Sequence, residues 1–201
     1  MQKDADTQKA KEPSVSYDKK LTYEDYLNFD FEYMVELIKG QLFKMEAAPS
    51  SGHQEISVNI TRLFSNYLVG KSCKLYHAPF DVILPVANER RCTSTTIVQP
   101  DLCVICDLEK IDEAGCCGPP DLIVEILSPS TQKKDLTHKY AIYEETGVKE
   151  FWVTYPFDQM LHLYKLEEGK YLRAEIYDHN DTVSTGLFPE LAIDLSEVFG
   201  A

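Results

Sequence analysis

The sequence predicts an α/β fold with a β-hairpin near each end. Two segments, residues 51–70 and 131–147, carry apolar residues at helical spacing. Strand-like runs lie between and after them, and the most apolar of these runs is 121–127. Paired runs on either side of short turns, at 34–45 and 160–177, predict the two hairpins. Strands that alternate with helices along the chain indicate the α/β class.

The chain is expected to form a disordered leader followed by one domain. Residues 1–18 are polar and charged and contain few large apolar side chains, so they cannot contribute to a packed core. Residues 19–201 are expected to form a single domain, because a chain of 201 residues with 44% hydrophobic content can bury a sizeable core.

Three elements are expected near the start of the domain: a short helix, a β-hairpin and a long amphipathic helix. A short helix is expected at 21–27 with Thr22 as its cap, since a hydroxyl at that position can accept from a free backbone N–H. The hairpin at 34–45 is expected to turn at Lys39-Gly40. From Ser51 apolar residues recur every three or four positions up to Gly70, which predicts an amphipathic helix.

Strand-like and helical runs alternate through the rest of the chain. Glycine or proline marks the ends of several of them, and a Glu-Glu-Gly-Lys segment marks the turn of the second hairpin. The expected elements are strands at 74–84, 97–106 and 121–127, a helix from about 131 to Gly147, a strand at 150–155, a hairpin of 160–166 with 171–177, an extended piece at 186–195 and a short closing helix.

Composition favours a cytoplasmic protein that does not bind anionic surfaces strongly. The net charge of -13, from 33 acidic and 20 basic residues, opposes binding to phosphate backbones and anionic membranes. No apolar run approaches the roughly 20 residues of a membrane span, and the first residues lack the apolar core of a secretory signal. The six cysteines are expected to be reduced thiols.

A zinc site is the alternative for the cysteines. Cys103 and Cys106 form a C-x-x-C pair, but residues three apart in a strand face opposite sides. Cys116 and Cys117 are adjacent and do not form a second such pair. Reduced thiols therefore remain the preferred interpretation.

Glu125 is the first candidate for chemistry. It lies within an apolar strand that is expected to be covered on both faces, and alternation puts it on the face of Ile123 and Leu127. An unpaired carboxylate there would cost several kcal/mol, so a cation, a basic side chain or solvent at a cleft must compensate its charge.

Asp101 is the second candidate, at the start of another apolar run. If the two strands are neighbours, both carboxylates come to one place, and oxygen ligands of this kind suit Mg²⁺ or Mn²⁺. The main-chain carbonyl of Ile126 is a further candidate ligand. The alternative is an aspartate that bonds its own turn and a glutamate in an ordinary salt bridge.

Lys139 completes the candidate set. On a helix at about 100° per residue it falls inside the arc of Leu136, Tyr140 and Tyr143, so its ammonium can point towards buried carboxylates. The alternative is a surface pair with Asp135. Two metal-binding acids and a lysine can hydrolyse a phosphodiester, because the metal polarises the phosphate and the ammonium stabilises developing charge.

Several motifs resemble the Uma-type family of restriction endonucleases, a branch of the PD-(D/E)XK superfamily. The resemblance covers roughly residues 20–195. The motifs are Gln99-Pro100-Asp101-Leu102, the string from Gly118 to Thr131 with its Pro-Pro-Asp-Leu-Ile-Val-Glu-Ile-Leu-Ser-Pro-Ser-Thr core, Asp135 with Lys139 and Tyr143, and Gly147-Val148-Lys149-Glu150-Phe151-Trp152-Val153.

The resemblance implies a restriction-endonuclease-like mixed β-sheet flanked by helices, with Asp101 and Glu125 as ligands of Mg²⁺ or Mn²⁺. The superfamily's lysine stands two residues after the acidic residue, where this chain has Leu127, and Lys139 is expected to replace it from the next helix. Glu36 and His53 also match the family pattern and are expected as auxiliary residues, with plain structural roles as the alternative.

The expected function is therefore a metal-dependent deoxyribonuclease, an endonuclease that acts as a homodimer on DNA. The dimer follows from analogy with related nucleases. One rival is a catalytically silent descendant that serves in protein or nucleic-acid interaction. A second rival is a hydrolase of small phosphodiesters, which the acidic composition would suit better.

Overall fold

The computed structural model describes residues 20–45, 49–87, 89–128 and 134–200. The expected leader and the beginning of the helix expected from about 131 lie outside these residues. Of the helices in the described ranges, none has the length and apolarity that crossing a membrane requires.

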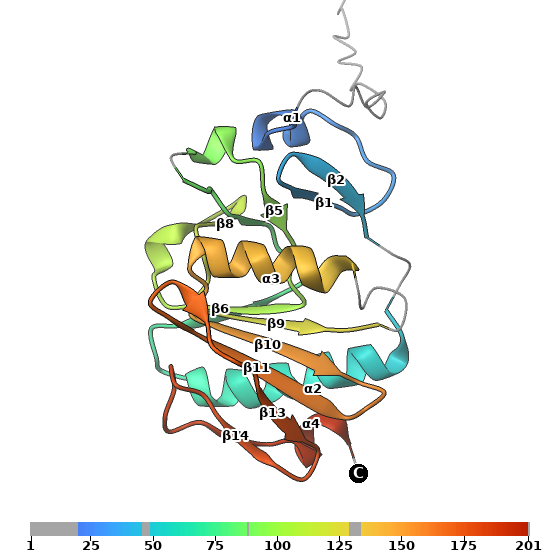
Figure 1. The fold of residues 1–201 in the computed structure, drawn as a ribbon, viewed down its shortest axis with the longest axis vertical. Coiled ribbons are helices and arrows are strands. Elements are labelled where there is room, and N and C mark those ends of the chain that lie inside the picture. The colour runs from blue at the N-terminus through green and yellow to red at the C-terminus, as the bar shows by residue number, and fades with distance from the viewer. Residues whose placement is uncertain (1–19, 46–48, 88, 129–133, 201) are drawn as a thin grey trace, which may run out of the picture.

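A mixed seven-stranded sheet forms the centre of the fold (Figure 1). Most neighbouring strands are antiparallel, and β9 and β10 are parallel. The sheet consists of β12 (Lys170–Tyr171), β11 (Met160–Glu167), β10 (Glu150–Tyr155), β9 (Leu122–Ile126), β6 (Leu102–Ile105) and β3 (Lys74–His77) in that order, with β13 (Glu175–Asp178) also paired to β11.

Two helices cover opposite faces of this sheet, as Figure 1 shows. The helix α2 (Ser51–Leu68) packs its apolar face on Leu122, Val124 and other side chains of one face. The helix α3 (Lys134–Thr146) packs Ile142 and Tyr143 on the opposite face. The strand β9 is therefore buried on both sides, which confirms the interpretation of its continuous apolar run.

The N-terminal hairpin belongs to a second sheet, which lies above α3 in Figure 1. Lys39 and Gly40 both have positive φ, 50° and 83°, as a tight two-residue hairpin turn requires. The strands of this sheet, in order, are β2 (Gln41–Lys44), β1 (Val35–Ile38), β5 (Ile97–Val98), β4 (Val82–Ile83), β8 (Gly115–Cys117) and β7 (Ile111–Asp112).

Two of the expected strands are each divided between the sheets. The run 74–84 forms β3 and β4, and the run 97–106 forms β5 and β6. Pro79 and Pro100 lie at the two breaks, where a residue without a backbone N–H cannot continue a strand ladder. The prediction that each run forms one unbroken strand was therefore wrong. Each break allows the chain to leave one sheet and join the other.

The short helices and connections mostly match the expectation. Thr22 and Asp25 form a reciprocal capping box at the start of α1 (Tyr23–Leu27). Two 3₁₀ turns, η1 (Arg91–Thr93) and η2 (Leu108–Lys110), were not expected.

The C-terminal region contains one more hairpin than expected. The run 171–177 is interrupted, so that β12 and β13 pair with β11 separately. The extended piece at 186–195 contributes only β15 (Ala192–Asp194), which pairs with β14 (Thr182–Ser184). The closing helix α4 (Ser196–Phe199) forms as expected.

The expectation that every cysteine is a reduced thiol was wrong for one pair. Cys73 precedes β3 and Cys106 follows β6, and the register Lys74↔Ile105 brings them opposite each other, where they form a disulfide. The two cysteines of the C-x-x-C pair face opposite sides of the sheet, since Cys103 packs with the α3 side and Cys106 with the α2 side. The free thiols are Cys92, Cys103, Cys116 and Cys117.

Candidate active site

Asp101 and Glu125 come from neighbouring antiparallel strands. The register pairs Leu102 with Val124, so the next position along places Asp101 opposite Glu125. Residues that face each other in this way are about 5 Å apart at Cα. The structure thus brings the two predicted acidic residues together.

The Asp101 carboxylate is held by two contacts. Its Oδ2 accepts a hydrogen bond of 2.6 Å from the backbone N–H of Ile126. Its Oδ1 lies 3.2 Å from Nε2 of His53, near the start of α2. The side chain is 21% exposed, so this carboxylate remains accessible from the cleft.

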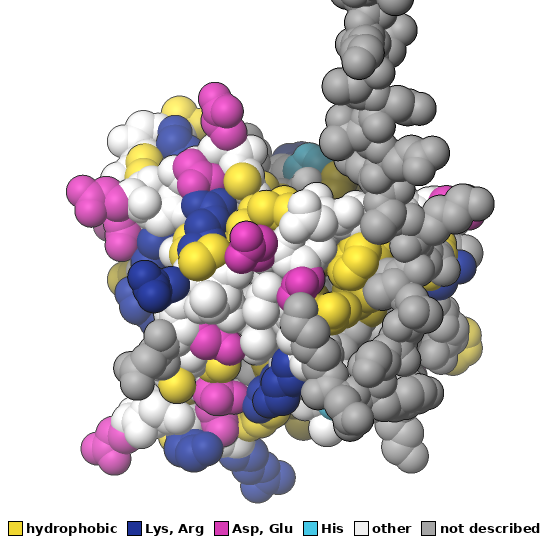
Figure 2. Space-filling model, turned by 90° about the horizontal axis from the view of Figure 1, so that it is seen from above, with side chains coloured by type: hydrophobic (Ala, Val, Ile, Leu, Met, Phe, Trp, Pro, Cys, Tyr) yellow, Lys and Arg dark blue, Asp and Glu magenta, His cyan; other side chains and the backbone are white. Residues whose placement is uncertain are grey.

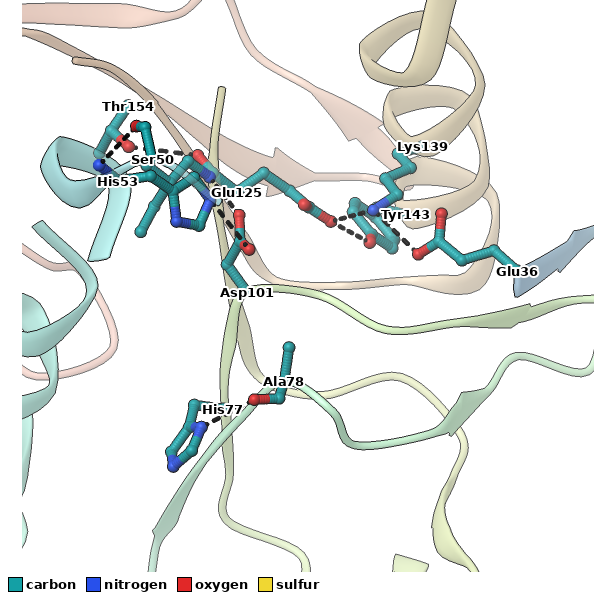
Figure 3. A network of polar contacts seen from close by, with 11 residues as sticks. Glu36, Ser50, His53, His77, Ala78, Asp101, Glu125, Lys139, Tyr143 and Thr154 are labelled. Atoms are coloured by element: carbon teal, nitrogen blue, oxygen red, sulfur yellow. Dashed lines mark hydrogen bonds and ion pairs between the residues drawn. The ribbon is translucent and has the colours of Figure 1, made fainter. Parts of the chain in front are cut away.

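Glu125 is buried beneath α3 and accepts two hydrogen bonds on one oxygen. Its Oε1 lies 3.0 Å from Nζ of Lys139 and accepts 2.7 Å from the hydroxyl of Tyr143 (Figure 3). Lys139 and Tyr143 are four residues apart and therefore share one face of the helix. The helix presents a cation and a hydroxyl to the same carboxylate.

Glu36 reaches the same ammonium from the other sheet. It lies on β1, is buried, and places Oε1 3.0 Å from Lys139 Nζ. The same oxygen accepts a hydrogen bond of 2.8 Å from the backbone N–H of Gln99. Figure 3 shows Glu36 and Glu125 converging on Lys139 from opposite sides.

The electrostatics of this cluster favour a protonated lysine and a weakly acidic glutamate. Burial raises the pKa of Glu125 to about 7, and the charges of Asp101 and Glu36 add to this effect against the opposing Lys139. For Lys139, burial alone would lower the pKa, but the carboxylates of Glu125 and Glu36 outweigh it and raise the pKa. Lys139 is therefore a permanent cation at neutral pH.

His53 contacts the acidic side of the cluster. Burial lowers its pKa, but the hydrogen bond to Asp101 and the charges of Asp101 and Glu125 outweigh burial and raise the pKa. Its Nδ1 is buried and has no hydrogen-bond partner within the described residues. The imidazole therefore contacts the Asp101 carboxylate through Nε2 alone.

The cluster lines a cleft of about 1100 Å³. Asp101, Glu125 and Lys139 line it together with Glu36 and His53. Further lining residues come from the β1–β2 hairpin that carries Glu36 and from the positions next to it. The structure thus brings all five predicted side chains to one accessible cavity.

The oxygen donors of the cleft suit a hard divalent cation. In the described ranges no group of three or more His, Cys, Asp or Glu could hold a metal ion without other ligands. An ion would therefore need the Asp101 and Glu125 carboxylates together with non-side-chain oxygens, such as the Ile126 carbonyl and water. Glu36 and Glu125 contact the single ammonium of Lys139, and Asp101 adds a third carboxylate to the cleft, so a divalent cation would balance the excess negative charge.

Two contacts of the site were not predicted from the sequence. Tyr143 was placed in the helical arc of Lys139, and its bond to Glu125 was not predicted. The backbone N–H of Gln99, which holds Glu36, carries no side-chain signal. The alternative partner of Lys139, Asp135, has no described side chain, and the ion pairs of Lys139 are with Glu36 and Glu125.

A family model matches most of the chain. The model described as "Uma2: Putative restriction endonuclease" matches residues 22–196. A relative from Synechocystis sp., described as "Uncharacterized protein slr1290", is 29% identical over 174 residues, which are 86% of this chain and 80% of the relative.

A solved structure has the same fold. It is described as a "putative nuclease belonging to DUF820" from Anabaena variabilis and superposes with a TM-score of 0.71 at 17% sequence identity. The alignment covers 89% of this chain and 97% of the other. The α/β architecture with a mixed sheet and flanking helices is thus shared with that protein.

Proposed function

The chain belongs to the family described as "Uma2: Putative restriction endonuclease", and from this premise we propose that it is a metal-dependent endonuclease that hydrolyses DNA phosphodiester bonds. The observation that carries the proposal is the position of Asp101 directly opposite Glu125, with the Lys139 ammonium 3.0 Å from Glu125, in an accessible cleft.

The carboxylates and one carbonyl are the proposed ligands of Mg²⁺ or Mn²⁺. Asp101, Glu125 and the main-chain carbonyl of Ile126 supply the hard oxygen donors that these ions prefer. When bound, the ion would neutralise charge on the scissile phosphate and promote ionisation of the attacking water. Asp101 is already oriented for this role by the N–H of Ile126 and by His53.

Lys139 is the proposed cationic catalytic group. Its ammonium is protonated and is held between Glu36 and Glu125, so it can donate to a phosphate oxygen without first recruiting a proton. It takes the part of the lysine that this chain lacks at Leu127. Glu36 and His53 are proposed as positioning residues, for Lys139 and Asp101 respectively.

The quaternary structure and location belong to the same proposal. A homodimer is proposed by analogy with related nucleases, in which two sites often act on two strands, and size-exclusion chromatography with light scattering tests it. A cytoplasmic location is proposed because the substrate, DNA, is found there. Neither feature is needed for the chemistry of one site.

The decisive experiment compares isosteric variants in a plasmid-nicking assay. Asp101→Asn, Glu125→Gln and Lys139→Met should each lower the Mn²⁺-dependent rate by about 100-fold or more, because each removes charge at the reacting centre. Chelator should abolish wild-type nicking. Calorimetric titration should show weaker Mn²⁺ binding for the Asp101 and Glu125 variants.

Two outcomes would select the rival functions. Absence of Mn²⁺ or Mg²⁺ binding by folded wild type would favour a silent nuclease-fold protein. Mn²⁺-dependent cleavage of a nitrophenyl phosphodiester without nicking of plasmid DNA would favour a small-substrate hydrolase. Wild-type nicking rates in all three variants would contradict the assigned site.

A further inference from the structure

One wall of the cleft is formed by apolar and aromatic side chains at the open end of the β1–β2 hairpin. Val35 pairs with Lys44, and the N–H of Met45 donates to the carbonyl of Met34 at 2.9 Å, so the residues flanking this pair are held side by side. We use the name hairpin wall for Tyr33, Met34, Lys44 and Met45, all of which line the cleft.

The hairpin wall combines an aromatic ring with a cation. The Lys44 ammonium lies 4.0 Å from the centroid of the Tyr33 ring. Tyr33 is 36% exposed and Met34 is 44% exposed, and both belong to the large hydrophobic residues that the fold leaves at its surface. An exposed ring and thioether beside an ammonium can contact a nucleobase and its phosphate together.

The charge of the cleft is unsuited to a duplex backbone. Lys44 and Lys139 are the only Lys or Arg residues among the described residues that line it, and Lys139 is engaged by Glu36 and Glu125. Duplex binding at physiological salt depends on several contacts between basic side chains and phosphates.

The face of the molecule drawn in Figure 2 has no continuous band of basic side chains among the described residues. In the coloured part of Figure 2, Lys and Arg side chains are interspersed with Asp and Glu, and apolar side chains lie between them. The net charge of the chain is -13. Binding must therefore draw on contacts other than long-range attraction of phosphates.

We propose that the substrate strand of this cleft is unpaired DNA, with one base stacked against Tyr33 and Met34 of the hairpin wall. Stacking on aromatic side chains is available only to bases that are not already paired and stacked in a duplex. Lys44 contacts the phosphate of the stacked nucleotide. This inference rests on the proposed nuclease function and names its substrate class.

The size of the cleft agrees with this substrate. About 1100 Å³ slightly exceeds the roughly 300–1,000 Å³ of a small-molecule site, so an unstacked segment of one strand fits inside. The catalytic cluster lines the same cleft, and Glu36 of β1 joins it to the hairpin that carries the hairpin wall. A base held on the hairpin wall therefore keeps its strand next to Asp101 and Glu125.

The test is equilibrium binding by fluorescence anisotropy in the presence of chelator, so that no cleavage occurs. The probes are a short labelled oligothymidine, the same backbone without bases, and a blunt duplex of the same length. Wild type should bind oligothymidine about tenfold more tightly than either other probe. That ratio corresponds to about 1.4 kcal/mol.

Variants of the hairpin wall separate stacking from charge. Tyr33→Ala should weaken oligothymidine binding about tenfold and leave binding of the base-free strand unchanged, while Tyr33→Trp should retain wild-type affinity. Phe157→Ala is the matched control, because Phe157 is 90% exposed and does not line the cleft. The affinity of Phe157→Ala for oligothymidine should equal that of wild type.

Several results would overturn the inference. They are tighter binding of the duplex than of oligothymidine, equal binding of the base-free strand, or an equal loss in Tyr33→Ala and Phe157→Ala. These results leave the proposed nuclease function intact, since nicking with Mn²⁺ is measured separately. Conversely, tight binding of oligothymidine in chelator, with no cleavage of DNA when Mn²⁺ is supplied, would overturn the proposed function alone.

Discussion

Lys139 of α3 donates to Glu125 of β9 across 3.0 Å in the interior of the protein, and the same ammonium lies 3.0 Å from Glu36 of β1. One buried cation is therefore shared by carboxylates from both sheets. This contact joins the N-terminal hairpin to the centre of the proposed active site. It makes the site sensitive to the loss of any one of the three charges.

Replacing Lys139 with methionine should impair both folding stability and activity. The change leaves two buried carboxylates without their cation, which costs about 3–5 kcal/mol. Urea denaturation at pH 8 measures this loss. The double variant Lys139→Met with Glu125→Gln should recover part of the free energy of unfolding, because it removes one of the unpaired charges.

Lys170→Met is the matched control for that variant. Lys170 is 80% exposed and pairs with Glu144, and neither residue lines the cleft, so its replacement should change stability far less than replacement of Lys139. Nicking should be unchanged. A Lys139→Met protein as stable as Lys170→Met would contradict the buried charge cluster.

Replacing Tyr143 with phenylalanine should move the pH dependence of nicking. The Tyr143 hydroxyl donates to Glu125 and lowers the pKa of that carboxyl, so its loss should raise the pKa further. The rise of the nicking rate with pH should then occur at higher pH than in wild type. The displacement is measured as the rate of plasmid nicking with Mn²⁺ at pH values from about 5.5 to about 9. This range includes the pKa values of about 6–7 at which catalytic glutamates titrate.

Tyr171→Phe tests whether that displacement comes from the site. The Tyr171 hydroxyl is also buried and donates to the carbonyl of Val148 at 2.9 Å, away from Glu125. Both phenylalanine variants should lose about 1–2 kcal/mol of stability. Only Tyr143→Phe should displace the pH profile, and equal displacement in both would argue against a specific bond to Glu125.

Without metal, Glu125 should make the protein less stable as pH rises. Its pKa is about 7 in the folded protein against an ordinary value of 4.5, so between these values the folded state binds more protons than the unfolded state. Stability therefore falls with increasing pH in this window. The full difference corresponds to about 3 kcal/mol.

The measurement is urea denaturation in chelator at several pH values, for wild type and Glu125→Gln. The contribution of Glu125 is present below pH 4.5 and is lost as pH rises through about 7, whereas glutamine does not titrate. The difference between the two curves should isolate this one group. Mn²⁺ added at pH 8 should stabilise wild type and not the variant. Parallel curves for both proteins would contradict the raised pKa.

The sequence was sufficient for the elements whose apolar pattern is uninterrupted. The helix α2 and the strand β9 were predicted because each buries a regular set of apolar residues, at helical spacing or as a continuous run. The turn at Lys39-Gly40 was predicted from a glycine between two strand-like runs, and in the structure both positions have positive φ. In these cases local chemistry and tertiary packing require the same conformation.

The division of strands between sheets could not be predicted from the same pattern. The runs 74–84 and 97–106 each resemble one continuous strand, and which sheet each half joins depends on partners distant in the sequence. Pro79 and Pro100 were available as signals of the breaks. The short strands β7 and β8 have too few residues to show a period.

The candidate site was predicted from charged residues that lie within apolar segments of the sequence. Glu125 and Lys139 stood out because each would be buried, and a buried charge needs a partner. The contact from the Gln99 backbone could not be found in this way, because every residue carries a backbone N–H. The roles of these residues in catalysis stay predictions.

The disulfide between Cys73 and Cys106 should stabilise the oxidised protein. It links residues separated by 33 positions, and a cross-link of that span contributes about 2–4 kcal/mol by limiting the unfolded chain. Cys73→Ser with Cys106→Ser should lower the urea midpoint without reductant and equal wild type with reductant. Cys92→Ser, at an exposed free thiol, should match wild type under both conditions.

Reduction of this disulfide should leave nicking intact. Cys106 follows β6 at the end opposite Asp101, and Asp101 is held independently by the N–H of Ile126 and by His53. Plasmid nicking with Mn²⁺ should therefore proceed at the same rate with and without reductant. Alkylation followed by mass spectrometry checks the bond itself, and modification of both Cys73 and Cys106 in the unreduced protein would show that the bond is absent in solution.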